Sequence, residues 1–447
     1  MRTSHRYWLF GALIAIIALV AVACGDDGDD EPTPGDDETP AATEPVDTGE
    51  VPGVTDTEVV LGTHTSLTGP IAAYNVIPNF TAAYFNYINA TEGGVNGRMI
   101  TYLQEDDQYS PPMAVDLTRK LVEQDGIFAM FNALGTPNHL QVVNFLQEQG
   151  VPDMYVATGA VEWVEDPAAR PLVFGSNPNY NGEGLVLGKY VADSFPGGKY
   201  GVIYQNDDFG QDGLVGIKLG VNDEAELVGE HSYEVTDADL NSQIALLRDA
   251  EADAVIMFVT PLLLGNAIRH ARQDLNWDTQ FVISAVSMNE LTALIAGEEN
   301  IAGTVGPVAT YMAWQDENEG IANHKSILEE HGVGTASGAT AASVLTLYAQ
   351  YVAELMTETL RLAGDELTRA SLVEAAESIE GWTCSICLFP VTLGPDDHDP
   401  GQAVALGVYA NGRIEITGPG YSWEGVAVAD LSVDSLQEIE VPADALP

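Results

Sequence analysis

Basic residues and cysteines are scarce in this chain of 447 residues. Lysine and arginine together number 16, against 67 aspartates and glutamates, and the formal net charge is −51 at pH 7. Such a surface repels phosphate backbones and anionic lipid head groups, so nucleic acids and anionic membrane surfaces are excluded as docking partners. Three cysteines are too few for the framework of a disulfide-rich domain. Hydrophobic residues make up 46%, which is ample for the cores of at least two lobes.

Motifs of the common enzyme classes are missing as well. The sequence has no GxxxxGKS/T phosphate loop, no GxGxxG, no HExxH and no GxSxG nucleophile elbow. The eight histidines are scattered, and we interpret His324 and His331, seven residues apart, as solvated surface residues. We therefore expect no enzyme, no cofactor and no metal site.

Cys384 and Cys387 form a CxxC pair after Trp382. A zinc site needs four ligands, and His398 is the only plausible third one. A thioredoxin-like redox centre needs a helix start and a βαβ context that this region lacks. We favour a structural disulfide between Cys384 and Cys387, formed in an oxidising compartment, over both alternatives.

The first 24 residues have the pattern of a secretory signal. Two arginines precede an uncharged apolar stretch, Tyr7–Ala23, which ends in small residues and is followed by Cys24. The string VAVAC resembles a bacterial lipobox, although Ala21 stands where a larger aliphatic residue is usual. We therefore expect 1–23 to be a lipoprotein signal peptide and Cys24 to carry a lipid anchor. The stretch is short for a membrane span, so an uncleaved anchor and a soluble secreted protein are the alternatives. All three place the body of the chain outside the cytoplasm.

The next segment, 24–56, is unsuited to form a core. Gly25–Asp56 contains twelve acidic residues and no basic ones, so its like charges repel and it has little apolar area to bury. We interpret 24–56 as an acidic disordered tether that holds the globular part off the membrane. The remaining body has 55 acidic and 14 basic residues, a net charge of −41.

From Glu58 onward, short apolar runs alternate with amphipathic stretches. This alternation predicts an α/β protein whose parallel sheets are flanked by helices. Phe174–Tyr180 interrupts the pattern with Asn and Pro, and a second series starts at Lys199, which predicts a hinge between two lobes. A long helix is expected over Ala336–Leu362. The candidate strands are Val59–Thr63, Met99–Glu105, Ile127–Phe131, Met154–Ala157, Tyr200–Tyr204, Ala254–Phe258, Gln280–Ile283 and the hairpin pair Val404–Tyr409 and Arg413–Thr417 around Asn411-Gly412.

Several loops, taken in order along the chain, resemble those of one family. The strings are SLTGPIAAY (Ser66–Tyr74), NATEGGVNGR (Asn89–Arg98), EDDQYSP (Glu105–Pro111), LVEQDGIFAMFNALGTPNH (Leu121–His139), GVPDMYVATGA (Gly150–Ala160) and YQNDDFGQDG (Tyr204–Gly213). Together they resemble the branched-chain amino acid type of periplasmic binding protein, the leucine/isoleucine/valine-binding family of ABC importers. The resemblance runs from about Val59 to Tyr409.

The resemblance implies two Rossmann-like lobes that close on a small solute, the type I periplasmic binding protein fold. Three hinge crossings would fall near Ser176, Pro307 and Val391. Closure would bury the ligand and exclude water, so that a few hydrogen bonds can set specificity. The lobes would comprise 57–176 plus 308–390 (lobe 1) and 177–307 plus 391–441 (lobe 2).

The resemblance also implies which loops contact the ligand. Ala133–Thr136 and Ala157–Gly159 match the family's contacts to a ligand carboxylate, and a glycine lets the backbone approach closely. Thr136 could instead cap a helix, and the glycines could be ordinary turn residues. Trp163 is a candidate wall of the cleft mouth. The expected ligand-binding residues are Ser66, Thr68, Tyr74, Ala133, Gly135, Thr136, Ala157, Thr158, Gly159, Phe209, Thr260, Ser284 and Ala285.

One departure from the family bears on the ligand. In the amino acid binders a carboxylate from the loop after Gln280–Ile283 pairs with the ligand's α-ammonium, whereas this chain has Ser284–Ser287 there and no acid before Glu290. A buried ammonium without a partner carries a large desolvation cost. We expect a branched-chain or related amino acid, with urea, a short amide or an aromatic carboxylate as rival ligands. Asp106 and Asp107 lie near the cleft by position and are interpreted as structural.

The expected function is that of an extracytoplasmic solute-binding receptor of an ABC importer. Its partners would be a small-molecule solute and an ABC permease in the membrane, and the chain would be a lipid-anchored monomer. A sensory ligand-binding protein and an extracytoplasmic hydrolase are the alternatives on a similar fold. A screen for ester, amide and phosphate hydrolysis would separate the hydrolase from the receptors.

Overall fold

The computed structural model describes residues 51–332 and 341–447. The expected signal peptide 1–23, Cys24 and most of the expected tether lie outside the described residues. The last part of that tether, 51–56, is folded: the Val60 amide donates to the Gly53 carbonyl at 2.8 Å, and Val54 pairs with Val59. The folded part therefore begins earlier than the charge pattern indicates. Among the residues described, no helix is long and apolar enough to cross a membrane.

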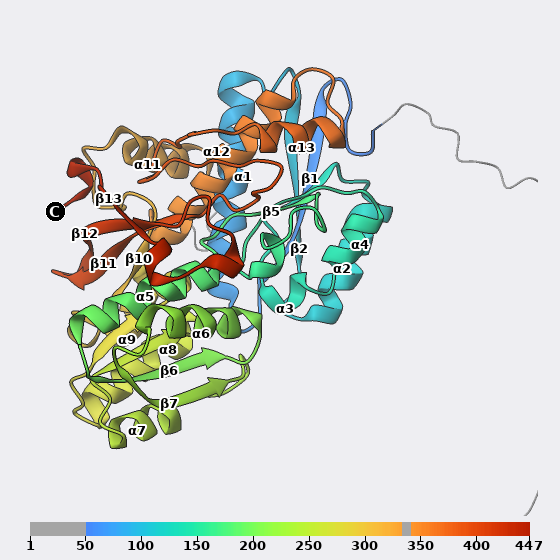
Figure 1. Ribbon diagram of the computed structural model, residues 1–447. Coiled ribbons are helices and arrows are strands. Elements are labelled where there is room, and N and C mark those ends of the chain that lie inside the picture. The colour runs from blue at the N-terminus through green and yellow to red at the C-terminus, as the bar shows by residue number, and fades with distance from the viewer. Residues whose placement is uncertain (1–50, 333–340) are drawn as a thin grey trace, which may run out of the picture. The chain divides into compact units, whose positions relative to one another are not determined.

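The first sheet has five parallel strands in the order β2-β1-β3-β4-β5. Helices cover both of its faces (Figure 1). Ala129 and Phe131 of β3 pack toward α1, while Met130 between them packs toward α2 and α4, as the two-residue repeat of a strand requires. The strands are β1 (Glu58–Thr65), β2 (Met99–Asp106), β3 (Ala129–Phe131), β4 (Asp153–Val156) and β5 (Val173–Gly175). The helices around it are α1 (Val76–Glu92), α2 (Pro111–Glu123), α3 (Thr136–His139), α4 (Val143–Glu148), α11 (Glu319–His331), α12 (Val344–Ala363) and α13 (Arg369–Glu377).

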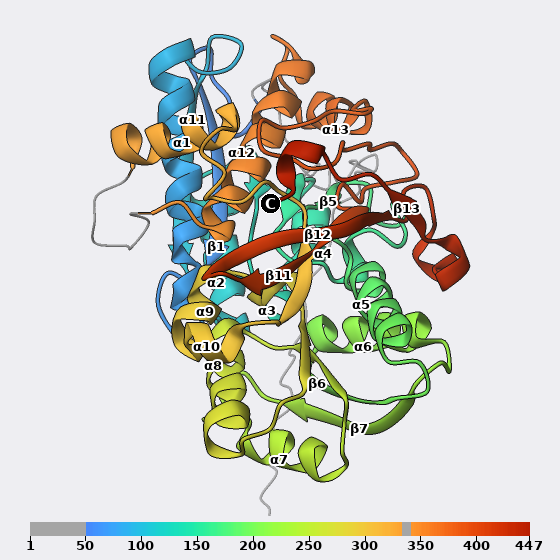
Figure 2. The same cartoon turned by 90° about the vertical axis from the view of Figure 1, so that its left-hand side faces the viewer.

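The second sheet has eight strands in the order β13-β12-β11-β10-β9-β8-β6-β7. It is mixed rather than wholly parallel, because β11, β12 and β13 run antiparallel to their neighbours. Figure 2 shows β11, β12 and β13 together, with β6 and β7 farther along. The strands are β6 (Lys199–Gln205), β7 (Glu226–Tyr233), β8 (Ala254–Phe258), β9 (Gln280–Ile283), β10 (Val305–Val308), β11 (Ala403–Ala410), β12 (Arg413–Ser422) and β13 (Gln437–Ile439). The helices are α5 (Tyr180–Ser194), α6 (Asp208–Val221), α7 (Asn241–Asp249), α8 (Pro261–Arg269), α9 (Glu290–Ala296) and α10 (Glu298–Ile301).

The fold is thus the expected one of two Rossmann-like lobes. The chain passes from one sheet to the other three times: between β5 and α5, between β10 and α11, and between α13 and β11. The residue boundaries assigned to the two lobes remain predictions.

Helices α5 and α6 approach each other unusually closely. A Cβ added at Gly184 would lie 2.4 Å from the Gly213 carbonyl oxygen, and one at Gly188 would lie 2.3 Å from that of Ile217. Glycine is therefore required where the two backbones touch. The glycine spacing in α5, which matches no nucleotide-binding motif, serves helix packing.

Two details of the sequence interpretation are wrong. His324 is fully buried rather than solvated: its ring stacks on Phe80, Nδ1 lies 2.7 Å from Oε1 of Gln350, and burial lowers its pKa to about 4. The helix expected from Ala336 begins at Val344, because the hydroxyl of Ser343 accepts the Thr346 amide and caps it; residues 336–340 lie outside the described part.

Candidate ligand-binding site

A cavity of about 190 Å³ lies between the two lobes. This is far more than the roughly 10–15 Å³ that one water needs, so the cavity has room for a small solute. Loops at the carboxyl ends of strands from both sheets contribute to its wall, as expected of an open α/β sheet. Eight of the thirteen expected residues line it: Tyr74, Gly135, Thr136, Ala157, Thr158, Phe209, Thr260 and Ala285.

The other five expected residues do not line the cavity. The Ser66 and Thr68 hydroxyls donate instead to Asp107 and Asp106 at 3.1 and 2.5 Å, which makes both carboxylates structural. Local packing explains why the remaining three expected residues do not line the cavity. Ala133 is in the core beside α2, Gly159 is where a Cβ would meet the Pro178 carbonyl at 2.2 Å, and Ser284 turns toward α5.

The lobe 1 end of the cavity carries paired hydroxyls. The Oγ1 atoms of Thr136 and Thr158 lie 2.5 Å apart, and Thr158 also contacts the Tyr180 hydroxyl at 3.4 Å. The N-cap of α3 is Gly135, with φ of 111°, so Thr136 is not the helix cap. Both threonine hydroxyls are therefore held at the cavity wall by each other, and Thr158 also accepts the Ala160 amide at 3.4 Å.

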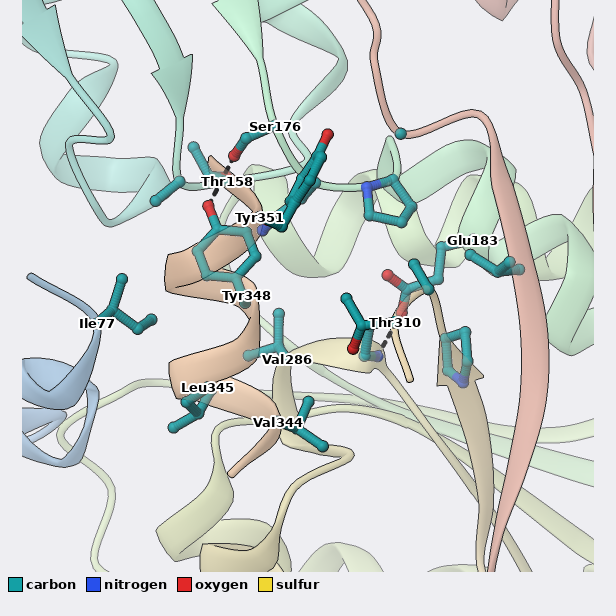
Figure 3. A pocket seen from close by; sticks show the side chains of 18 of the residues that line it. Ile77, Thr158, Ser176, Glu183, Val286, Thr310, Val344, Leu345, Tyr348 and Tyr351 are labelled. Carbon is teal, nitrogen blue, oxygen red and sulfur yellow. Dashed lines mark hydrogen bonds between the residues drawn. The ribbon is translucent and has the colours of Figure 1, made fainter. Parts of the chain in front are cut away.

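Helix α12 supplies a face of the cavity that the loop comparison missed. Val344, Leu345, Tyr348 and Tyr351 line it, and Figure 3 shows them together with Ile77. The Tyr348 hydroxyl is fixed by the Ser176 hydroxyl at 2.7 Å and by the Asn132 side-chain amide at 2.8 Å. The helical spacing of 344, 348 and 351 was the available sequence signal.

A buried carboxylate, Glu183 of α5, was also missed. Its side chain lines the cavity, the residue is 1% exposed, and it accepts the Ala285 amide at 2.9 Å. Burial raises the pKa of Glu183 to about 7, although the hydroxyl of Ser284 and the Ala285 amide oppose this effect. In Figure 3, Glu183 and Thr310 lie on the side of the pocket opposite Ile77. An acid in the otherwise uncharged first turns of a helix was the signal in the sequence.

Besides the contact between Thr158 and Tyr180, at least four hydrogen bonds join the lobes around the cavity. The Tyr74 hydroxyl donates to the Val286 carbonyl at 3.0 Å, and the side-chain amide of Gln205 donates to the Tyr109 hydroxyl at 3.2 Å. The other two join a backbone amide to a carboxylate: Val161 to Asp212 and Val344 to Glu290, both at 3.0 Å. These contacts across the cleft describe a closed arrangement.

Comparison with known proteins identifies the family. Residues 58–413 match the family model described as "Periplasmic binding protein". This chain belongs to the periplasmic binding protein family. The match covers most of the chain, and it agrees with the resemblance of the loops.

Curated relatives of this periplasmic binding protein are solute-binding proteins. "Leu/Ile/Val-binding protein homolog 2" of Brucella abortus is 27% identical over 262 residues, 57% of this chain and 68% of the relative. The "Leucine-, isoleucine-, valine-, threonine-, and alanine-binding protein" of Pseudomonas aeruginosa is 25% identical over 235 residues, 52% of this chain and 61% of the relative. Membership of the family indicates an extracytoplasmic location.

Solved structures share the fold. A "branched chain amino acid ABC transporter from Thermus thermophilus with bound valine" aligns with a TM-score of 0.75 at 17% identity, covering 83% of this chain and 98% of that one. A "Fatty acid ABC transporter substrate-binding protein from Thermomonospora curvata" aligns with a TM-score of 0.71 at 20% identity, covering 86% and 96%. The names of these two proteins therefore indicate ligands of very different polarity.

Beneath the cavity of this periplasmic binding protein runs a buried chain of four titratable groups. His64 Nδ1 lies 2.8 Å from Asp107, His64 Nε2 lies 3.2 Å from His139 Nδ1, and His139 Nε2 lies 2.6 Å from Asp153. Each carboxylate can accept one ring N–H, which links the four side chains by hydrogen bonds. Burial lowers the pKa of His64, although its hydrogen bond to Asp107 opposes this effect. Trp163 is 1% exposed and packs edge-on against His139, so it does not wall the cleft mouth.

The two cysteines of the CxxC pair are bonded to each other as a disulfide. His398, the residue considered as a third zinc ligand, has Nδ1 2.8 Å from the Val173 carbonyl and a ring stacked on Phe174. Within the described ranges no group of three or more potential ligands is arranged to hold a metal ion.

Proposed function

We propose that the protein is the extracytoplasmic solute-binding receptor of an ABC importer. It closes on a small solute, a branched-chain or related amino acid, and delivers it to a membrane permease. The observation that carries this proposal is the cavity between the lobes, whose wall is built from loops of both sheets and closed by hydrogen bonds from one lobe to the other. A clamp of this kind binds by burying the solute, since removal of water strengthens each polar contact.

Within this function, Thr136 and Thr158 contact the polar end of the solute from lobe 1, and Phe209 and Thr260 contact it from lobe 2. All four line the cavity, which supports the assignment. The lobes themselves are 57–176 plus 308–390 and 177–307 plus 391–441, and they rotate about the three crossings. The receptor acts as a monomer.

A lipid on Cys24 anchors the receptor to the membrane, and the acidic segment that follows spaces it from the surface. Replacing Cys24 by serine, C24S, is expected to move the protein from the membrane fraction to the soluble extracytoplasmic fraction. Mass spectrometry of the mature N-terminal peptide is the direct check. An unprocessed peptide beginning at Met1 would refute the anchor.

Thermal unfolding of the purified protein with a panel of solutes tests the receptor function. The panel comprises leucine, isoleucine, valine, glutamate, urea, acetamide and benzoate. A solute at a hundred times its Kd stabilises the folded state by roughly 2.7 kcal/mol. For roughly 400 residues this raises Tm by about 3 °C. A shift with an aliphatic amino acid supports the proposal, and a shift with an amide or carboxylate alone moves the ligand class while keeping the receptor.

A further inference from the structure

The cavity wall has a one-sided distribution of charge. Glu183 is the one acidic residue among the described residues that line it, and that set contains no lysine, arginine or histidine. An anionic solute would therefore find no cationic partner, while a cation would find a carboxylate. The one formal charge of the cavity wall is negative, whereas a cleft that binds a carboxylate needs a positive partner.

The carboxyl group of Glu183 is held in place by uncharged partners only. Its two hydrogen-bond donors, the amide of Ala285 and the hydroxyl of Ser284, are both uncharged. The residue is 1% exposed, so water does not solvate it. A desolvated carboxylate without a cationic partner is unfavourable, and a cation that enters the cavity would remove that penalty.

Aromatic rings form much of the remaining wall. The faces of such rings attract organic cations, and the attraction grows when the cation is desolvated. On the side of the pocket away from Glu183 lie Ile77, Val344 and Leu345, which offer an apolar surface (Figure 3). The aromatic residues in the wall are Tyr74, Tyr109, Tyr180, Phe209, Tyr348, Tyr351 and Phe389.

We propose that the solute is a small organic cation, an alkylammonium whose charged head lies against Glu183 and whose apolar part extends toward Ile77 and Leu345. This inference rests on the proposed receptor function and replaces the amino acid as its ligand by an organic cation that has no carboxylate. A fatty acid, which the name of one structural neighbour gives as its ligand, would bring a second carboxylate to Glu183 and is disfavoured by repulsion.

Four probes of nearly the same shape and different charge test the inference: 3-methylbutylammonium, 4-methylpentanamide, 4-methylpentanoate and leucine. Isothermal titration of the purified protein at pH 8 measures each affinity. The ammonium is expected to bind at least tenfold more tightly than the neutral amide and than leucine, and the carboxylate is expected not to bind. This ranking on the unaltered protein does not depend on any variant.

The variant Glu183→Gln keeps the shape of the side chain and removes its charge. It is expected to weaken ammonium binding about a hundredfold and to change amide binding less than threefold. Asp399→Asn is the matched control, because Asp399 is also a buried carboxylate, accepts the Asn179 amide at 2.7 Å and does not line the cavity. The control is expected to leave the ranking of the probes unchanged.

The outcomes separate the two proposals. Tight binding of leucine or of the carboxylate, with no preference for the ammonium, overturns the cation inference and leaves the receptor function standing. Equal loss of ammonium and amide binding in Glu183→Gln also overturns it, because the residue would then be a structural support. If none of the four probes nor any solute of the thermal panel binds, the receptor function fails as well.

Discussion

Removal of the Asp107 carboxylate tests whether the buried chain of His64, Asp107, His139 and Asp153 stabilises the fold next to the loops that line the cavity. Asp107 is fully buried and accepts hydrogen bonds from His64 at 2.8 Å, Ser66 at 3.1 Å, Asn138 at 2.8 Å and the Tyr109 amide at 2.8 Å. Asp107→Ala leaves four buried or partly buried donors without their acceptor. One unsatisfied buried donor costs roughly 1–3 kcal/mol, so a total loss of about 4 kcal/mol is expected.

The corresponding change in Tm follows from the size of the protein. At roughly 2.1 cal/mol/K per residue over roughly 400 residues, a loss of about 4 kcal/mol lowers Tm by about 5 °C. Differential scanning calorimetry at pH 7 measures it. Asp106→Ala is the control next in the chain, because Asp106 is partly exposed and its donors can turn to water; a loss under about 1 kcal/mol is expected there.

The decline of Tm at low pH supplies an independent measurement. Burial alone would raise the pKa of Asp107, but the hydrogen bonds from His64, Asn138 and the Tyr109 amide hold it below the ordinary aspartate value. A lowered folded-state pKa contributes stability that is present above the unfolded value near 3.9 and is lost as pH falls through the folded value. Asp107→Asn should therefore flatten the decline of Tm below about pH 4. An unchanged decline of Tm at low pH, or a loss below about 1 kcal/mol in Asp107→Ala, would refute this account of the chain.

Three further predictions concern packing, closure and the paired hydroxyls. Gly188→Ala should destabilise the protein by at least about 1–3 kcal/mol through overpacking against α6, whereas Gly394→Ala, where no atom lies within 4 Å of the new Cβ, should be nearly neutral in the same urea titration. Burial raises the pKa of Asp212 to about 6, so the stability that this carboxyl contributes is fully present below the unfolded value near 3.9 and is lost as pH rises through about 6. Asp212→Asn should therefore raise Tm by an amount worth about 1–2 kcal/mol at pH 7.5 and by little at pH 3.5, while its amide oxygen still accepts from Val161. Thr158→Val should lower the free energy of unfolding by about 1–2 kcal/mol. It should also weaken, about tenfold in calorimetric titration, the binding of the solute that stabilises the unaltered protein. An unchanged Kd would show that Thr158 does not contact the solute.

The sheets were largely predictable because their central strands are buried on both faces. β8 and β9 read as uninterrupted apolar runs, and their predicted bounds match the observed ones. β7 was missed because it is an edge strand with a mostly exposed, charged sequence, and β13 is a short edge strand of the same kind. The hairpin was predictable from Asn411-Gly412, both of which have positive φ.

The candidate site was predictable only where it is formed by loops that directly follow predicted strands. Loops such as 133–136 and 157–159 follow adjacent parallel strands, so their convergence follows from topology. The α12 face and Glu183 reach the cavity through helix packing across the fold, and nothing within a few residues of them indicates which way they point. His324 was misjudged for the same reason, since its partners come from α1 and α12.

The hydrogen bonds that close the cleft have a consequence for how such a receptor changes its ligand over evolution. In three of the four, one partner is a main-chain atom: the carbonyl of Val286 and the amides of Val161 and Val344. Main-chain groups are retained through almost any substitution, so in each of these three hydrogen bonds one partner does not depend on the side chain at its position. Side chains that face the cavity can therefore be replaced while the lobes still close. The ligand selectivity of such a receptor could change in this way without loss of the closed conformation.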